Sequence, residues 1–261
     1  MSNVTIKNKK EIAAMREGGK KLAEAMKVLE GKVHTIARTK ISTLDLDKLA
    51  EKLVFRTGGK PSFKGYGDGT SKPFPATLCI SVNNEVVHGV PQKDKVLKNG
   101  DILKIDVGMK YKNMYLDMAR TFAIGKISEK AQKLIDVTRK SLDIGIKELK
   151  AGNNLSSYSK AVQKYVERNK FSVIRRLVGH GVGYAVHEDP QVPNFYNKKY
   201  QDLELKPGMT LALEPMVNEG DYEIVLDDDG LTFKTKDGKL SAHFEDTIVI
   251  TEKGAEILTR L

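Results

Sequence analysis

The chain has 261 residues, a formal net charge of +10 and a single cysteine, Cys79. One cysteine excludes an intramolecular disulfide, and no apolar run is long enough to span a bilayer. The N-terminus is basic but lacks the apolar segment of a secretory signal. We therefore expect a cytoplasmic protein without membrane association. Its length suits one domain over residues 1–261, with two halves at roughly 12–150 and 151–261.

The basic charge by itself does not indicate a nucleic-acid-binding protein. Lysines are spread through the whole chain, and no recognition module or basic platform with spaced aromatic residues appears. Most of this charge is expected to form a solvated surface. A weak, salt-dependent attraction to ribosomal RNA remains compatible with it. No large apolar surface stripe is visible, so we expect a monomer.

Two amphipathic helices are predicted near the N-terminus. The first carries apolar residues at helical spacing from Ile12 to Leu29, and Asn8 and Glu11 before it have the spacing of a capping box. The second helix begins at Ser42. Its predicted buried stripe consists of Leu46, Leu49 and Leu53.

Two apolar-rich strands, at residues 101–109 and 114–122, are predicted to form a hairpin with its turn centred at Tyr111 and Lys112. In that register Asp106 and Asp117 lie directly opposite each other. Cross-strand partners have Cβ atoms about 4.5–5.5 Å apart, so the two charges would repel. An isolated pair of this kind is more often solvated, but two divalent ions about 3.5–4 Å apart would also fit between such carboxylates.

Two further helices are predicted after the hairpin, one from Ser128 through Lys150 and one from Leu155 to Arg168. Helices therefore precede and follow the first pair of strands and precede the second set. This order predicts a mixed α/β (α+β) architecture with the helices on the outside of the sheet.

The second half of the chain repeats the acidic positions of the first half. The segment around Glu214 echoes the segment around Asp106 at a constant offset, and a later segment resembles the second arm of the hairpin. The predicted matches are Gly100 with Gly208, Asp106 with Glu214, and Asp117 with Glu245. Buried acids are unfavourable unless they are paired or bind metal, so four acids at matched positions favour a metal site.

Three of the five histidines occur in unusual local contexts: His88, His180 and His187. Glycines flank His180 and would let the backbone approach an ion or a ligand closely. Imidazole and carboxylate together suit Mn, Fe, Co or Zn. The contexts of His34 and His243 do not indicate a site, and we interpret His34 as structural.

These motifs, in this order and spacing, resemble those of type I methionine aminopeptidases, and the likeness runs from about Ile12 to the C-terminus. The motifs are His88-Gly-Val-Pro, Asp106 with Asp117, Gly179-His180-Gly-Val-Gly followed by His187-Glu-Asp-Pro, Leu213-Glu214-Pro-Met-Val, and Phe244-Glu245-Asp-Thr. The resemblance implies a pseudo-two-fold pita-bread fold, with a curved, antiparallel-rich sheet, helices on the outside and an enclosed dinuclear metal centre.

The resemblance also implies roles for the site residues. The ligands of two divalent ions (Mn, Fe, Co or Zn) would be Asp106, Asp117, His180, Glu214 and Glu245. A bridging water of lowered pKa would attack the first peptide bond as hydroxide. Glu214 would also shuttle a proton, and His88 and His187 would contact substrate rather than metal. The substrates would be nascent polypeptide N-termini, from which the initiator methionine is removed when a small residue follows.

A methionine pocket is predicted around five residues: Tyr66, Phe74, Cys79, Val186 and Leu231. Several relatives carry tyrosine in place of Phe74, an aromatic residue in place of Val186 and tryptophan in place of Leu231. Residues 67–72 look like an insertion in the pocket loop, so the shape and stringency of the pocket stay open. A thiol nucleophile at Cys79 is disfavoured, because the metal cluster explains every well-placed histidine better.

Two alternatives remain at this point. An X-Pro aminopeptidase or prolidase-like hydrolase would use nearly the same ligands, but such relatives usually carry a separate N-terminal domain, and here helices and pocket strands occupy the residues before Asp106. The short interval between His187 and Glu214 also lacks the helical insertion of type II enzymes. A non-catalytic ribosome-binding pita-bread protein would be expected to have lost ligands, whereas all five are present.

Overall fold

The computed structural model describes residues 3–36, 39–67, 72–199 and 202–261. Its helices are α1 (Lys9–Val33), α2 (Thr43–Arg56), α3 (Glu129–Lys147) and α4 (Ser156–Arg168). The strands are β1 (Lys60–Pro61), β2 (Leu78–Val82), β3 (Glu85–Val87), β4 (Ile102–Tyr111), β5 (Met114–Ala123), β6 (Ser172–Val173), β7 (Gly179–Gly181), β8 (Glu188–Val192), β9 (Thr210–Leu213), β10 (Met216–Asn218), β11 (Ile224–Leu226), β12 (Phe233–Thr235), β13 (Ser241–His243), β14 (Glu245–Thr251) and β15 (Gly254–Ile257).

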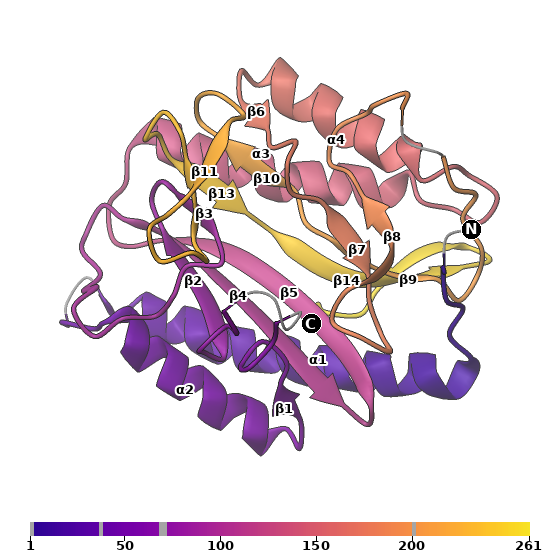
Figure 1. Cartoon of the computed structure of the whole chain (residues 1–261), viewed down its shortest axis with the longest axis horizontal. Coiled ribbons are helices and arrows are strands. Elements are labelled where there is room, and N and C mark those ends of the chain that lie inside the picture. The colour runs from indigo at the N-terminus through magenta and orange to yellow at the C-terminus, as the bar shows by residue number, and fades with distance from the viewer. Residues whose placement is uncertain (1–2, 37–38, 68–71, 200–201) are drawn as a thin grey trace.

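A nine-stranded sheet forms the centre of the molecule. Its strand order is β1-β4-β5-β14-β9-β7-β8, with β2 also paired to β4 and β15 to β14. All its pairings are antiparallel, and β5 of the first half pairs directly with β14 of the second. Helices α1 and α2 lie beside the strands of the first half, and α3 and α4 beside those of the second (Figure 1). The predicted mixed α/β architecture is confirmed.

The predicted starts of the first three helices are confirmed. Asn8 accepts hydrogen bonds from the backbone N–H groups of Lys10 and Glu11, and the Glu11 carboxylate accepts one from the N–H of Asn8. This is a complete capping box, and Ser42 forms the second one, with Asp45. Such caps satisfy N–H groups that have no partner within the helix.

Two details of the predicted helices are wrong. Helix α3 ends at Lys147 rather than at Lys150. In α2 the fully buried apolar residues are Leu46, Ala50 and Val54, whereas Leu49 and Leu53 are only partly buried. A small alanine fits close to the sheet, so the helix is turned toward it and the two leucines lie at the margin of the contact.

The predicted register of the hairpin is also wrong. Tyr111 pairs with Met114, so the loop consists of Lys112 and Asn113, which have φ angles of 46° and 68°. Two residues with positive φ form the turn type whose twist matches the flanking strands. Asp106 therefore lies opposite Ala119 and Asp117 opposite Gly108. The two aspartates are diagonal neighbours on one face of the sheet, still within reach of each other.

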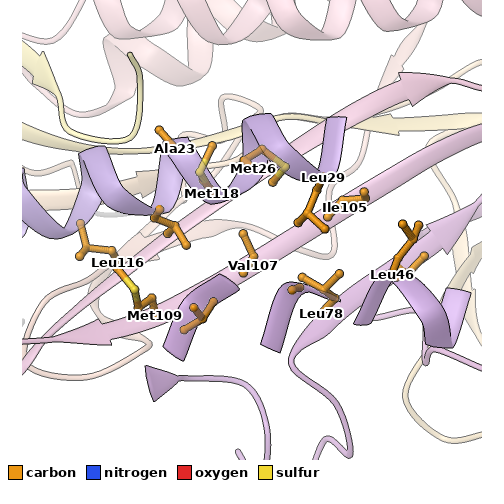
Figure 2. Packing of buried hydrophobic residues seen from close by; sticks show 14 of the residues in the cluster. Ala23, Met26, Leu29, Leu46, Leu78, Ile105, Val107, Met109, Leu116 and Met118 are labelled. Atoms are coloured by element: carbon orange, nitrogen blue, oxygen red, sulfur yellow. The ribbon is translucent and has the colours of Figure 1, made fainter. Parts of the chain in front are cut away.

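The other face of the hairpin packs on the first two helices (Figure 2). Ile105, Val107 and Met109 of β4 belong to a buried apolar cluster with residues of α1 and α2. Successive side chains of a strand point to opposite faces, so this packing directs Asp106 away from the helices. The apolar core thus determines which face of the hairpin carries the acids.

The internal repeat is real, but one predicted match is wrong. Gly100 and Gly208 both have positive φ, at 97° and 89°, and each lies two residues before its strand. Within the sheet, Glu245 pairs with Ala119, and Asp246 pairs with both Met118 and Leu213. Leu213 lies opposite Asp246, which aligns Glu214 with Glu245, just as Asp106 lies opposite Ala119. The match of Asp106 with Glu214 therefore makes Ala119, rather than Asp117, the counterpart of Glu245. The acids of the two halves converge in space although the position of Glu245 in its strand differs from that of Asp117.

Two glycines of α1 give a stability prediction. A Cβ atom added at Gly19 would lie 2.2 Å from the carbonyl oxygen of Leu258, whereas one added at Gly31 would meet nothing within 4 Å. We expect Gly19→Ala to lower the free energy of unfolding by about 1–3 kcal/mol, because α1 must move away from the C-terminal segment. Gly31→Ala is the control and should raise that free energy by up to about 1 kcal/mol. Urea unfolding measures both, and equal effects at the two sites would contradict the packing described here.

Candidate metal centre and substrate cavity

Four acids and two histidines from six segments converge at the centre of the sheet. They are Asp106 on β4, Asp117 on β5, His180 on β7, Glu214 directly after β9, His243 on β13 and Glu245 at the start of β14. Asp106 is 8% exposed and Asp117 3%. A solvated hairpin is therefore excluded, because both carboxylates are buried.

The side chains lie within the range that a small ion can bridge. The Nε2 atom of His180 is 3.7 Å from Glu214 Oε1 and 4.0 Å from Glu245 Oε1. Ligand atoms of Asp117, His180 and Glu245 all lie within 4.8 Å of one another. Nδ1 of His180 is 2.8 Å from the carbonyl oxygen of Gly181, which can only accept a hydrogen bond. Nδ1 must then carry the proton, and the Nε2 lone pair faces the acids as a metal ligand requires.

Without a cation, burial opposes the ionisation of the acids in this cluster. Burial raises the pKa of Asp106 to about 7 and raises the pKa of Asp117, Glu214 and Glu245 well above the usual carboxyl value. Burial also lowers the pKa of His180 to about 3, so an imidazolium does not compensate the acids. One oxygen each of Asp106, Asp117 and Glu245 is buried without a hydrogen-bond partner among the described residues. A carboxylate and imidazole donor set of this kind fits divalent Mn, Fe, Co or Zn.

The sequence analysis missed His243. Its ring is 1% exposed, and Nε2 lies 3.6 Å from Glu214 Oε2 and 4.0 Å from Glu245 Oε2. Neither ring nitrogen has a hydrogen-bond partner in the described part of the chain. Its position two residues before Glu245 was an available signal, since side chains two apart on a strand share a face. His34, by contrast, lies on the surface at the C-terminal end of α1, away from this cluster.

A cavity of about 290 Å³ opens beside the acids. It brings together nearly all of the predicted site residues. Those lining it are Tyr66, Phe74, Cys79, His88, Asp106, Asp117, His180, His187, Glu214, Leu231 and Glu245, together with Phe63, Gly67 and Lys72. Val186 does not line the cavity but packs in one apolar cluster with Phe74 and Cys79, so it supports the wall from behind. Of the predicted insertion at 67–72, residues 68–71 lie outside the described residues.

The two histidines predicted to contact substrate lie at this cavity. His88 follows β3 with a φ of 57°, a left-handed conformation that non-glycine residues seldom adopt. The His187 ring is 4.4 Å from the His180 ring, and its Nδ1 is 2.6 Å from the Tyr66 hydroxyl. His187 itself is exposed at the mouth, where the backbone turn, Tyr66 and the ring of His180 hold it in place.

The fold and the buried acid–histidine cluster define a metallohydrolase, and comparisons with known proteins agree. The model of metallopeptidase family M24 matches residues 13–252. Among curated proteins, a methionine aminopeptidase of Clostridium perfringens is 49% identical over 98% of both chains. Methionine aminopeptidase 1 of Bacillus subtilis is 45% identical over 99% of this chain and all of its own. The chain belongs to metallopeptidase family M24, in its methionine aminopeptidase branch.

Solved structures give the same result for the fold. The methionine aminopeptidase of Thermotoga maritima superposes with a TM-score of 0.91 at 43% identity, covering 99% of this chain and 100% of its own. The expected pita-bread fold is confirmed. The prolidase of Pyrococcus furiosus has a TM-score of 0.77 at 22% identity and shares the fold, but this chain covers only 65% of it. Within the described residues, we find no helix both long and apolar enough to cross a membrane.

Proposed function

We propose that this chain is a metal-dependent aminopeptidase that removes the N-terminal methionine from newly made polypeptides when a small residue follows. The observation that carries this proposal is a cavity with an apolar wall that ends at four acids, of which Asp106, Asp117 and Glu245 are buried and Glu214 is partly buried. An α-amino group placed at that junction would lie beside the acids, while the methionine side chain enters the apolar part. The family relationship supports the same reaction.

The proposed centre holds two divalent ions (Mn, Fe, Co or Zn) through five residues: Asp106, Asp117, His180, Glu214 and Glu245. The orphaned oxygens and the oriented Nε2 of His180 support this ligand set. Such ions, when bound, lower the pKa of a coordinated water and polarise a carbonyl group. His243 lies close enough to Glu214 and Glu245 to orient both carboxylates.

We assign the proton transfers to Glu214. Its carboxyl group lies between His180 and His243, and burial raises its pKa far above the usual value. A carboxylate placed beside the attacking water and the leaving nitrogen can accept a proton from the first and deliver it to the second. His88 and His187 are proposed to contact the scissile peptide group, because both line the cavity beside Glu214. Neither is proposed as a metal ligand.

The side-chain pocket is proposed to be selective for methionine. Phe63, Phe74 and Cys79 form its apolar wall with support from Val186, and Leu231 and Tyr66 complete the lining. Aromatic rings beside a thioether give favourable sulfur–aromatic contacts, and a flexible unbranched side chain fits an irregular pocket. In this proposal the pocket selects methionine as the residue that is removed. The acids lie beside the α-amino group, so cleavage occurs at the N-terminal end of the chain.

We propose a cytoplasmic location and a monomeric state for this enzyme, with nascent chains as its substrates. The net charge of +10 supports a weak attraction to ribosomal RNA. Co-sedimentation with ribosomes should then decrease as the salt concentration rises. Binding that is independent of salt would contradict an electrostatic origin.

The test is hydrolysis of Met-Ala-Ser and Met-Lys-Ser by chelator-stripped protein to which each divalent metal is returned separately. We expect methionine release from the first peptide only, restored by one or more of Mn, Fe, Co and Zn. An Ala-Pro dipeptide tests the X-Pro alternative in the same assay. Folded protein that releases no methionine with any metal would reject the proposal, and cleavage of Ala-Pro instead would favour a prolidase-like enzyme.

A further inference from the structure

The N-terminal segment before α1 lies against the turn that carries His187. The backbone N–H of Asn3 donates to Asp189 Oδ2 at 3.0 Å, and the backbone N–H of Lys7 donates to the carbonyl oxygen of Gly208 at 2.8 Å. Segments more than 170 residues apart in sequence are therefore joined beside the turn whose His187 lines the substrate cavity.

The Lys7 side chain is buried in this contact. It is only 1% exposed, and its Nζ lies 2.6 Å from Glu188 Oε2, where the Glu188 side chain is 8% exposed. The ammonium also donates to the hydroxyl of Thr5 and lies 4.7 Å from the centre of the Tyr184 ring. Lysine is almost never fully buried unless it is paired, so the burial of this ion pair distinguishes it from an ordinary contact between exposed side chains.

Two glycines provide the space for Lys7. A Cβ atom at Gly183 would lie 2.3 Å from Lys7 Cε, and one at Gly208 would lie 2.9 Å from the carbonyl oxygen of Lys7. Both glycines also have positive φ angles, 142° and 89°. Any side chain at either position would push Lys7 out of the contact.

The Glu188 carboxylate uses its second oxygen to close the turn. Oε1 accepts hydrogen bonds from the backbone N–H groups of Tyr184 and Ala185. Burial acts to raise the pKa of Glu188, but the hydrogen bonds from Lys7 and Thr5 outweigh it and hold that pKa below its usual value. The carboxylate thus stays charged and keeps both backbone groups bound.

The turn closed in this way, residues 184–188, presents two functional side chains. Val186 supports the wall of the cavity, and His187 lies at its mouth. His187 is exposed, and its position depends on this backbone, on the hydroxyl of Tyr66 and on contact with the His180 ring. A change at Glu188 would be transmitted directly to the adjacent His187.

We propose that Lys7 and Glu188 are positioning residues that set the orientation of His187 at the substrate cavity, an inference that rests on the proposed function for its effect on turnover. The N-terminal segment is then part of the active-site architecture, although it supplies no group that touches substrate.

The test compares Lys7→Met, Glu188→Gln and the double variant with the unmodified protein, using Met-Ala-Ser at 15 °C and saturating metal. Each single variant should lose kcat by a factor of about 10 while keeping its metal content. The double variant should lose no more than the worse single variant, because both substitutions remove one interaction. Arg16→Met is the matched control, since it breaks the exposed ion pair with Glu256 that also joins α1 to a distant strand. It should keep the full rate.

A second readout does not depend on turnover. In protein labelled with ¹⁵N-histidine, the ring resonances of His187, assigned with His187→Gln, should shift in Lys7→Met and Glu188→Gln but not in Arg16→Met. Unchanged His187 resonances together with an unchanged kcat in folded Lys7→Met would overturn the proposal. If Lys7→Met does not fold, Glu188→Gln decides, because it keeps the shape of the side chain and removes the charge that pairs with Lys7; an unshifted His187 in folded Glu188→Gln would overturn the proposal. Failure of the unmodified protein to cleave Met-Ala-Ser would instead reject the proposed function, and the resonances would still test the positioning.

Discussion

Glu214→Gln is expected to lower kcat by a factor of about 10³ while the protein stays folded. Glutamine has the same shape but can neither carry the proton nor supply a charged oxygen to a metal. The position is critical because Glu214 lies within 3.7 Å of Nε2 on both His180 and His243. Glutamine is neutral without taking up a proton, whereas a glutamate in this cluster must be protonated or keep a poorly solvated charge, so the substitution should also raise the stability of the metal-free protein.

The measurement is steady-state hydrolysis of Met-Ala-Ser at saturating metal, together with urea unfolding. Glu219→Gln is the matched control, because this acid directly follows β10, pairs with Lys130 at 2.7 Å and does not line the cavity. It should keep turnover. Near-normal turnover in Glu214→Gln, or in the parallel variant Asp106→Asn, would remove the basis for the proposed roles.

The second large effect is expected on removal of metal. In chelator-stripped protein the thermal midpoint should fall as the pH rises from about 6.5 to 8.5, and saturating Mn or Co should abolish that fall. The folded carboxyl groups have raised pKa values, with Asp106 at about 7 and the other three well above the usual value. In this window the folded protein holds protons that the unfolded chain has already released. Because the folded state holds more protons than the unfolded state, the free energy of unfolding decreases as the pH rises.

Other buried groups set the lower limit of the pH range in which this fall is expected. Burial lowers the pKa of His88 to about 4 and the pKa of both His180 and His243 to about 3. Below pH 6.5 the unfolded histidines gain protons that the folded ones do not, which opposes the effect of the acids. Above pH 6.5 the acids dominate. Burial lowers the pKa of Lys104 to about 7 and also lowers the pKa of Lys7, so these two groups act in the opposite direction. They oppose three acids whose pKa lies well above the usual value, while Asp106 adds to the fall only near pH 7.

Differential scanning fluorimetry across this pH range, with and without metal, measures the effect. Calorimetric titration in buffers of different ionisation enthalpy should show release of protons when metal binds, because carboxyl groups must ionise to become ligands. A thermal midpoint that stays level between pH 6.5 and 8.5 in stripped protein would show that the four acids do not carry the predicted raised pKa values.

Local patterns in the sequence determined much of this protein. The capping boxes at Asn8 and Ser42 predicted the starts of α1 and α2, because the side-chain oxygen and the N–H groups it satisfies lie within one turn of chain. Motifs containing Asp106, His180 and Glu214 identified the family and the acids that the structure brings together. Each of these inferences needs only residues that are close in sequence, or a spacing between motifs.

Only the tertiary structure decided how these segments meet. The turn at Lys112 and Asn113 sets the hairpin register. Its centre lies one residue further along the chain than predicted, so Asp106 lies opposite Ala119 instead of Asp117. His243 reaches Glu214 only because β10 and β13 pair, and Lys7 reaches Glu188 only because the N-terminal segment packs beside the edge strand β8 and the turn before β9. Such contacts depend on backbone angles in turns and on packing between distant segments. Chain order and periodicity specify the face on which a side chain lies, whereas packing selects the partner that it meets there.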